Sequence, residues 1–299
     1  MQTYRPTRAP QQFFVLINGL RQHILHWPHP LRPKLLFLHG WMDCAFTFQQ
    51  VIDFLPTDYE VFALSWRGFG QSDWQEQGYY ERMVMLQDLH GVLKHISPND
   101  AIHLIGHSMG SMLATHYSCL FPEKVASLTM AEGFGMPALK NTEQLRQRMR
   151  RFVESQTQAP LSHLLSLQMV SDKLIKRNPA MQADFAHFMA QALTRPVDNN
   201  QYVYRADPKH DLPQAHPYDW DYLKSLWAHL SMPVLWLEGE NLPHNHYLNQ
   251  LYESLDQRRQ LLPNLRQCVT LSGSGHMLQW EAPEAFAKAL HDFLRQLDT

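Results

Sequence analysis

Short apolar runs, separated by polar and turn-forming residues, dominate both ends of the 299-residue chain. Most are continuous rather than alternating, which is typical of parallel strands buried on both faces. The predicted strands are 34–40, 60–66, 101–108, 125–132, 233–240 and 267–276, and helical patterns lie between or after them at 85–96, 109–121 and 283–297. The alternation predicts an α/β fold, with a mostly parallel central sheet covered by helices. Asn18 and Gly19, between two apolar runs, predict a β-hairpin before it.

The middle of the chain differs in composition from both ends. All 13 glycines lie at or before Gly135 or at and after Gly239. Sharp turns at strand ends favour glycine, whereas short helices joined by Pro, Asn and Asp do not need it. We therefore expect a helical lid inserted at 135–230, with 1–134 and 231–299 forming the core domain. The arginines of the amphipathic segment 142–155 are expected to form a solvated face: Arg146, Arg148, Arg150 and Arg151.

Composition narrows the possible partners and the compartment. The 26 basic and 28 acidic residues nearly balance, so nothing in the charge favours nucleic acid. No run approaches the roughly 20 apolar residues of a membrane span, and the N-terminus lacks the pattern of a signal peptide. The three widely spaced cysteines, Cys44, Cys119 and Cys268, suit buried free thiols better than disulfides. We therefore expect a cytoplasmic protein.

The stretch "GHSMG" at 106–110 carries the clearest chemistry in the sequence. It follows a predicted strand directly and precedes a predicted helix directly. Such a turn holds its serine strained and exposed, and the flanking Gly106 and Gly110 avoid clashes where the turn packs. The helix N-terminus adds N–H groups and partial positive charge near a developing oxyanion. Ser108 is therefore a candidate nucleophile, and the alternative is a purely structural turn.

A serine nucleophile needs a base, and His276 is the best placed of 18 histidines. It lies in a glycine-flanked loop between the last predicted strand and the last predicted helix, at the same sheet edge as Ser108. The alternative is an exposed loop histidine without a catalytic role. His244 and His246 would form a metal pair, but no third ligand has a recognisable spacing, so we expect neither metal nor cofactor.

These motifs together resemble those of the α/β-hydrolase family, in the order "FLHGWMD" (37–43), "SWRGFGQSD" (65–73), "GHSMG" and "GSGHM" (273–277). The resemblance extends over essentially the whole chain and places the family's lid domain in the middle segment. The stretches "YRADPKHDLP" (204–213) and "WDYLKSLWAHLSMPVLWLEGEN" (220–241) resemble those of serine hydrolase-like proteins and small bacterial esterases. The resemblance implies that the backbone N–H groups of Trp41 and Met109 form the oxyanion hole, and that His39 shapes the oxyanion loop.

The sequence offers three candidates for the acid of the triad. In the commonest version of the family the acid lies three residues after the glycine that closes a strand. That glycine is Gly239 here, so the position is occupied by Leu242. A second version places the acid after the preceding strand, where Glu132 stands. We rank Glu132 first, Glu240 second and Glu238 third, because strand boundaries read from sequence slip by two residues or more.

The leading hypothesis is hydrolysis of a carboxylic ester through an acyl-enzyme, with a small-molecule ester of apolar acyl chain as substrate. Thioesterase, lactonase, amidase and carbon–carbon hydrolase chemistry stay open, as does a non-catalytic ligand-binding member of the fold. A serine in place of aspartate disfavours epoxide hydrolase and haloalkane dehalogenase chemistry. Large apolar lid residues would line the acyl pocket or form the lid's own core: Met149, Phe152, Leu164, Leu165, Met169, Phe185, Phe188 and Met189.

Overall fold

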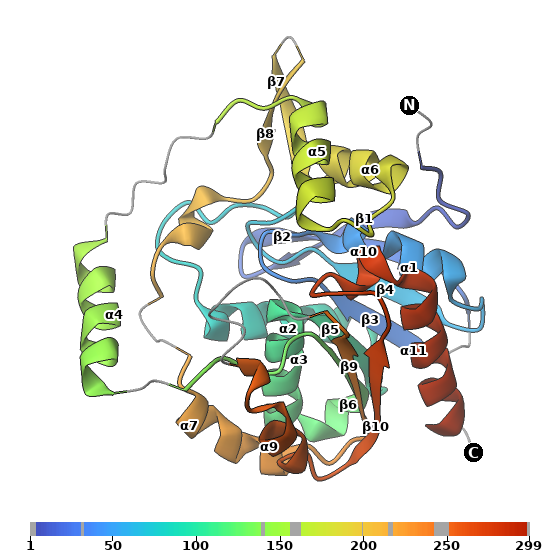
Figure 1. Ribbon diagram of the computed structural model, residues 1–299, viewed down its shortest axis with the longest axis vertical. Coiled ribbons are helices and arrows are strands. Elements are labelled where there is room, and N and C mark those ends of the chain that lie inside the picture. The colour runs from blue at the N-terminus through green and yellow to red at the C-terminus, as the bar shows by residue number, and fades with distance from the viewer. Residues whose placement is uncertain are drawn as a thin grey trace.

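An eight-stranded sheet forms the centre of the molecule (Figure 1). The strands lie in the order β1-β2-β4-β3-β5-β6-β9-β10; β1 and β2 run antiparallel to their neighbours, and the other pairs are parallel. Their bounds are β1 Gln11–Ile17, β2 Leu20–Trp27, β3 Lys34–Leu38, β4 Glu60–Leu64, β5 Ile102–His107, β6 Val125–Ala131, β9 Val234–Gly239 and β10 Leu265–Leu271. This computed structural model describes residues 4–30, 33–138, 141–155, 163–198, 200–214, 218–241 and 251–297. The predicted mostly parallel α/β fold is confirmed.

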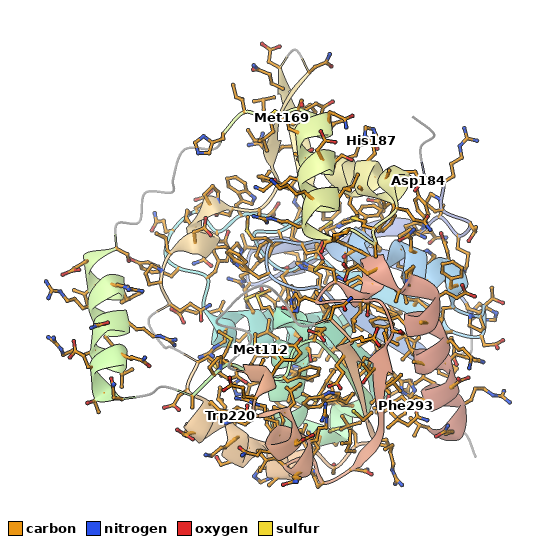
Figure 2. The ribbon with its side chains drawn as sticks, viewed as in Figure 1. Met112, Met169, Asp184, His187, Trp220 and Phe293 are labelled. Carbon is orange, nitrogen blue, oxygen red and sulfur yellow. The ribbon has the colours of Figure 1, made fainter. Side chains whose placement is uncertain are left out.

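Helices cover both faces of the sheet (Figure 1). One face packs against α1, α10 and α11, and the other against α2, α3, α7 and α9. Their bounds are α1 Gln49–Phe54, α2 Arg82–Ile96, α3 Met109–Leu120, α7 Trp220–Leu223, α9 Leu255–Gln260, α10 Leu278–Glu281 and α11 Pro283–Leu297. Phe293 of α11 and Trp220 of α7 belong to separate buried clusters and lie on opposite sides of the sheet (Figure 2). The apolar runs of the strands are therefore buried from two sides.

The N-terminal hairpin forms where the sequence predicts it. Ile17 pairs with Leu20, so Asn18 and Gly19 make a two-residue turn. Both have positive φ, 51° and 78°, as this kind of turn requires.

The sequence predicts a helical insertion, but the inserted segment also contains a β-hairpin. It contains α4 Thr142–Glu154, α5 Leu167–Arg177 and α6 Ala183–Leu193, followed by a hairpin of β7 Thr194–Asp198 and β8 Gln201–Tyr204. Asn200, with φ 62°, lies in its turn, and a two-stranded ribbon tolerates the proline in β7 because each strand has an open edge. Helix α4 stands apart from α5 and α6 and buries no residue (Figure 1).

The end of the expected lid packs with the core. Trp220, Trp227 and Leu230 belong to the same buried cluster as α2 and α3. The division at 135 and 230 stays a prediction, and this packing favours a boundary before Trp220.

Two predictions from composition concern membrane-spanning helices and the three cysteines. No helix in the described ranges is both long and apolar enough to cross a membrane. Cys44 and Cys119 are buried free thiols, but Cys268 is exposed, so the expectation that all three are buried is wrong. Cys268 lies on β10, the last strand of the sheet, on the face whose residues are exposed in alternation with half-buried ones.

Candidate active site

Ser108 occupies a strained turn between β5 and α3. Its φ of 51° and ψ of −118° place a non-glycine residue outside the ordinary regions of backbone space. The Ser108 N–H donates to the Ala131 carbonyl at 2.9 Å, which ties the turn to the neighbouring strand β6. Strain of this kind persists only where the surroundings enforce it, and it is common at functional sites.

Two glycines allow the turn to pack this tightly. A Cβ on Gly106 would lie 2.3 Å from the Ser111 Cα, and one on Gly110 would lie 2.1 Å from the Leu38 carbonyl oxygen. Both contacts involve main-chain atoms, which cannot move aside as a flexible side chain could. The glycines of the motif therefore do what the sequence predicts for them.

His276 lies between Ser108 and Glu132. Its Nε2 is 3.1 Å from the Ser108 Oγ, and its Nδ1 is 3.2 Å from the Glu132 Oε2. A carboxylate only accepts hydrogen bonds, so this arrangement assigns the proton to Nδ1 and leaves Nε2 to accept from the serine hydroxyl. Three side chains far apart in the sequence thus form one continuous hydrogen-bonded chain.

Glu132 follows the end of β6 and is almost fully buried. Its φ is 51°, and its Oε1 accepts from the Gly239 N–H at 2.7 Å. The Tyr252 hydroxyl donates to the same Oε2 that faces His276. The carboxylate is therefore held by donors on both of its oxygens.

The other two candidate acids point elsewhere. Glu240 is exposed and accepts from the Gly273 N–H at 2.8 Å and the Ser272 hydroxyl at 3.0 Å. Those bonds lower the pKa of Glu240. Glu238 accepts from the Trp236 indole at 2.8 Å and pairs with Arg259. Neither carboxylate has a hydrogen bond to His276, so Glu132 is the only one of the three in position to orient the imidazole.

Several sequence-level candidates lie outside the described residues, namely Leu242, His244 and His246. Within the described ranges, no group of three or more His, Cys, Asp or Glu side chains is placed to hold a metal ion.

The loop after β3 positions the first proposed oxyanion donor. His39 is fully buried, its Nδ1 donates to the Gly40 carbonyl at 2.7 Å, and its Nε2 accepts from the Trp66 N–H at 3.0 Å. Burial lowers the pKa of His39 to about 3, so the ring is neutral. In a trans peptide the carbonyl and the next N–H point in opposite directions. Fixing the Gly40 carbonyl against His39 therefore turns the Trp41 N–H away from His39.

The second proposed donor is the Met109 N–H. Met109 is the first residue of α3, and the first N–H groups of a helix have no partner within it. Trp41 and Met109 line the same cavity as Ser108. The two donors are thus available on the side where a substrate would meet the serine.

Sequence reasoning missed a supporting histidine. His107 is buried, and its Nε2 donates to the His276 carbonyl at 2.8 Å, while its Nδ1 accepts from the Gln279 amide at 3.3 Å. Burial lowers the pKa of His107 to about 3. This neutral side chain fixes the backbone of the His276 loop. The available signal was its place in the motif, directly before Ser108.

A cavity of about 550 Å³ opens at Ser108, within the size range of small-molecule sites. Its apolar lining includes Met112 of α3, which lies near the centre of the molecule (Figure 2). The described lining contains none of the eight apolar lid residues proposed from sequence. Phe185 and Met189 instead form the core between α5, α6 and the sheet domain, and Met169 is exposed on α5. Among the described residues, the larger apolar side chains of the lining are Trp41, Met85, Met109, Met112, Met136, Pro213, Tyr218 and Leu251.

The sequence profile of a family described as the alpha/beta hydrolase fold matches residues 33–283. This match covers most of the chain, so the chain belongs to the α/β-hydrolase family.

Individual relatives are distant. The chain is 23% identical over 275 residues to a zebrafish (Danio rerio) serine hydrolase-like protein, covering 87% of this chain and 81% of that one. It is 24% identical over 297 residues to epoxide hydrolase 3 of Mus musculus, covering 94% of this chain and 75% of that one. Its fold is similar to that of a thioesterase domain from the curacin biosynthetic pathway, with a TM-score of 0.83, 22% identity and coverage of 96% and 99%. Three other curated relatives, all named as hydrolases, are matched over only 41%, 56% and 57% of their own length.

Proposed function

We propose that the protein is a serine hydrolase that cleaves carboxylic esters through an acyl-enzyme. Ser108 is the nucleophile, His276 the general base and acid, and Glu132 the triad acid. The observation that carries the proposal is the hydrogen-bonded chain from the Ser108 hydroxyl through His276 to Glu132, opening into the cavity. These distances lie within the reach expected of a nucleophile and its base.

In the first half-reaction, the Ser108 hydroxyl transfers its proton to His276 Nε2 while Oγ attacks the ester carbonyl carbon. The negative charge that develops on the carbonyl oxygen is stabilised by the N–H groups of Trp41 and Met109, and losing one such donor costs about 3 to 4 kcal/mol of barrier. The tetrahedral intermediate then collapses, and the alkoxide leaves with the proton from His276. The product alcohol is released, and the acyl group stays on Ser108.

In the second half-reaction, water takes the place of the alcohol. His276 Nε2 accepts a proton from the water, whose oxygen attacks the acyl carbonyl, and the second tetrahedral intermediate collapses to the acid. Ser108 recovers its proton from His276. Throughout, the buried Glu132 stabilises the imidazolium and keeps Nε2 aimed at the serine.

The residue at the nucleophile position separates this chemistry from that of the epoxide hydrolase relative. Opening an epoxide in this fold requires an aspartate that forms an alkyl-ester intermediate, and here the position is Ser108. Acyl transfer to a serine hydroxyl is the reaction that the arrangement supports.

A fluorophosphonate tests the proposal against a non-catalytic role of the same cavity. We expect one equivalent of covalent label on the wild-type protein and none on Ser108→Ala. Hydrolysis of p-nitrophenyl butyrate, compared with that of a butyryl thioester, then distinguishes ester from thioester preference. A folded wild-type protein that neither reacts with the fluorophosphonate nor cleaves either substrate would overturn the proposal.

A further inference from the structure

Three arginines line the cavity that opens at Ser108. Arg82 comes from the first turn of α2, and Arg148 and Arg151 come from α4. Besides the histidine-bound Glu132, Asp211 is the one acidic side chain in the described lining. The described lining therefore carries three arginines against two carboxylates, a net positive charge, beside an otherwise largely apolar wall.

The arginines of α4 fall into two pairs with different surroundings. Arg146 pairs with Glu143 at 2.7 Å, and Arg150 pairs with Glu154 at 2.6 Å, both on the solvent side of the helix. Arg148 and Arg151 instead line the cavity, so the four arginines do not form one common face as expected. Helical geometry explains the difference. Arg148 and Arg151 are three residues apart and lie on one face of α4, whereas the ion-paired Arg146 and Arg150 lie on another.

Arg148 and Arg151 make no ion pair or hydrogen bond within the part of the chain that the structure describes. Residues three positions apart on a helix are neighbours, so the two guanidinium groups can approach one anion together. A guanidinium offers parallel N–H donors that match the two oxygens of a carboxylate, or those of a phosphate. The pair is therefore suited to an anionic group.

Arg82 adds a partly desolvated charge to the same wall. Its guanidinium lies 4.8 Å from the centre of the Tyr218 ring, a cation–π distance. Burial lowers the pKa of Arg82, which means that its surroundings disfavour the positive charge. A ligand anion in the cavity would offset that cost.

We propose, on the basis of the serine hydrolase function above, that the substrate is an ester carrying a second, anionic group. The ester carbonyl lies at Ser108, and an apolar spacer lies along the methionines of the cavity lining. The anion binds to Arg148 and Arg151, with Arg82 nearby. The monoester of a dicarboxylic acid is the simplest member of this class.

Two esters of equal length separate this proposal from a general preference for apolar acyl chains. Mono-p-nitrophenyl adipate and p-nitrophenyl hexanoate differ only in the terminal carboxylate. We expect the wild-type protein to favour the adipate in kcat/KM, and the Arg148→Gln/Arg151→Gln variant to lose about tenfold of that preference, mainly through KM. Arg146→Gln/Arg150→Gln is the matched control, because it removes the same charge from the other side of α4, and it should keep the wild-type ratio.

The outcomes that overturn the proposal are distinct from those that overturn the function. An adipate-to-hexanoate ratio that is unchanged in Arg148→Gln/Arg151→Gln, or that falls equally in the control, rules out the anion site. If neither ester is cleaved and the fluorophosphonate does not label Ser108, the hydrolase function fails, and calorimetric titration of the wild-type protein with adipate still decides the site. Adipate binding that is lost in Arg148→Gln/Arg151→Gln supports it, and no binding overturns it. Inhibition by adipate compared with hexyl phosphate identifies the preferred anion.

Discussion

Replacing Glu132 by glutamine tests the assignment of the triad acid while keeping the size of the side chain. The carboxylate accepts from the Gly239 N–H on one oxygen, and from His276 and Tyr252 on the other. Glutamine has only one side-chain oxygen. It can therefore accept hydrogen bonds either from Gly239 or from His276 and Tyr252, but not from both. The other side then meets an NH₂ group in a buried position.

Each orientation of the amide has a definite consequence. If its oxygen stays with Gly239, the NH₂ faces His276 Nδ1, and the ring must carry its proton on Nε2. That proton then points at the Ser108 Oγ, and the imidazole cannot act as base. If the oxygen faces His276, the NH₂ opposes the Gly239 N–H at a site where the native distance is 2.7 Å. An unsatisfied buried donor costs about 1 to 3 kcal/mol.

The expected loss is therefore large in kcat. Changing the acid of a serine triad to its amide lowers kcat by about 10³- to 10⁴-fold, or roughly 4 to 5 kcal/mol of barrier. Steady-state hydrolysis of p-nitrophenyl butyrate measures it, with circular dichroism to establish that the variant is folded. Glu240→Gln is the matched control and should stay within about twofold of wild type, since its exposed side chain accepts hydrogen bonds from Ser272 and Gly273 and, among the described residues, has none to His276. A folded Glu132→Gln with kcat within tenfold of wild type, or an equal loss in Glu240→Gln, would refute the reasoning.

Three further predictions concern the support of the site. Gly133→Ala should destabilise the fold by about 3 kcal/mol and lower kcat about 100-fold, because the added Cβ would lie 2.2 Å from the Ser108 carbonyl oxygen. Thermal melting measures the stability and steady-state kinetics the kcat, and a variant with wild-type stability and wild-type kcat would contradict this. Arg258→Met should cost about 3 kcal/mol of unfolding free energy, because the guanidinium donates to the carbonyls of Phe134 and Met136 at 2.8 and 2.9 Å; a loss below 1 kcal/mol in urea denaturation would contradict this. As the pH falls through 5.5, the free energy of unfolding should also fall, by roughly 3.5 kcal/mol per pH unit. Burial lowers the pKa values of four histidines from 6.5, that of His23 to about 4 and the other three to about 3, so unfolding takes up protons below pH 6.5, and Asp43, with its pKa raised to about 7, offsets one of them. Urea denaturation at pH 7 and 5.5 measures this, and a flat or opposite dependence would contradict it; the other three histidines are His39, His107 and His210.

Much of the sheet could be predicted from sequence because its central strands are buried on both faces. The run at 34–40 contains β3, and the run at 125–132 ends one residue beyond β6. The β7–β8 hairpin could not be predicted in the same way, since Arg195, Pro196 and Asp198 of β7 are exposed and follow no apolar pattern. Its stability depends on pairing and on packing around α6.

The site was predictable where local sequence determines local shape. The turn at Ser108 is enforced by glycines within two residues of it. The choice among the three acids depends instead on contacts between distant segments, such as the hydrogen bond from the Gly239 N–H to Glu132. His107 and Tyr252 were missed for the same reason, because their roles follow from partners more than 100 residues away in the chain.

The central claim is that Ser108 carries the acyl group during turnover. Rapid acid quench of the protein with p-nitrophenyl butyrate, followed by mass spectrometry of proteolytic peptides, tests it directly. We expect a butyryl group on the peptide that contains Ser108, accumulating within the first turnover and absent from Ser108→Ala. Ester hydrolysis with no acyl group on that peptide, or with the acyl group on another residue, would contradict the account.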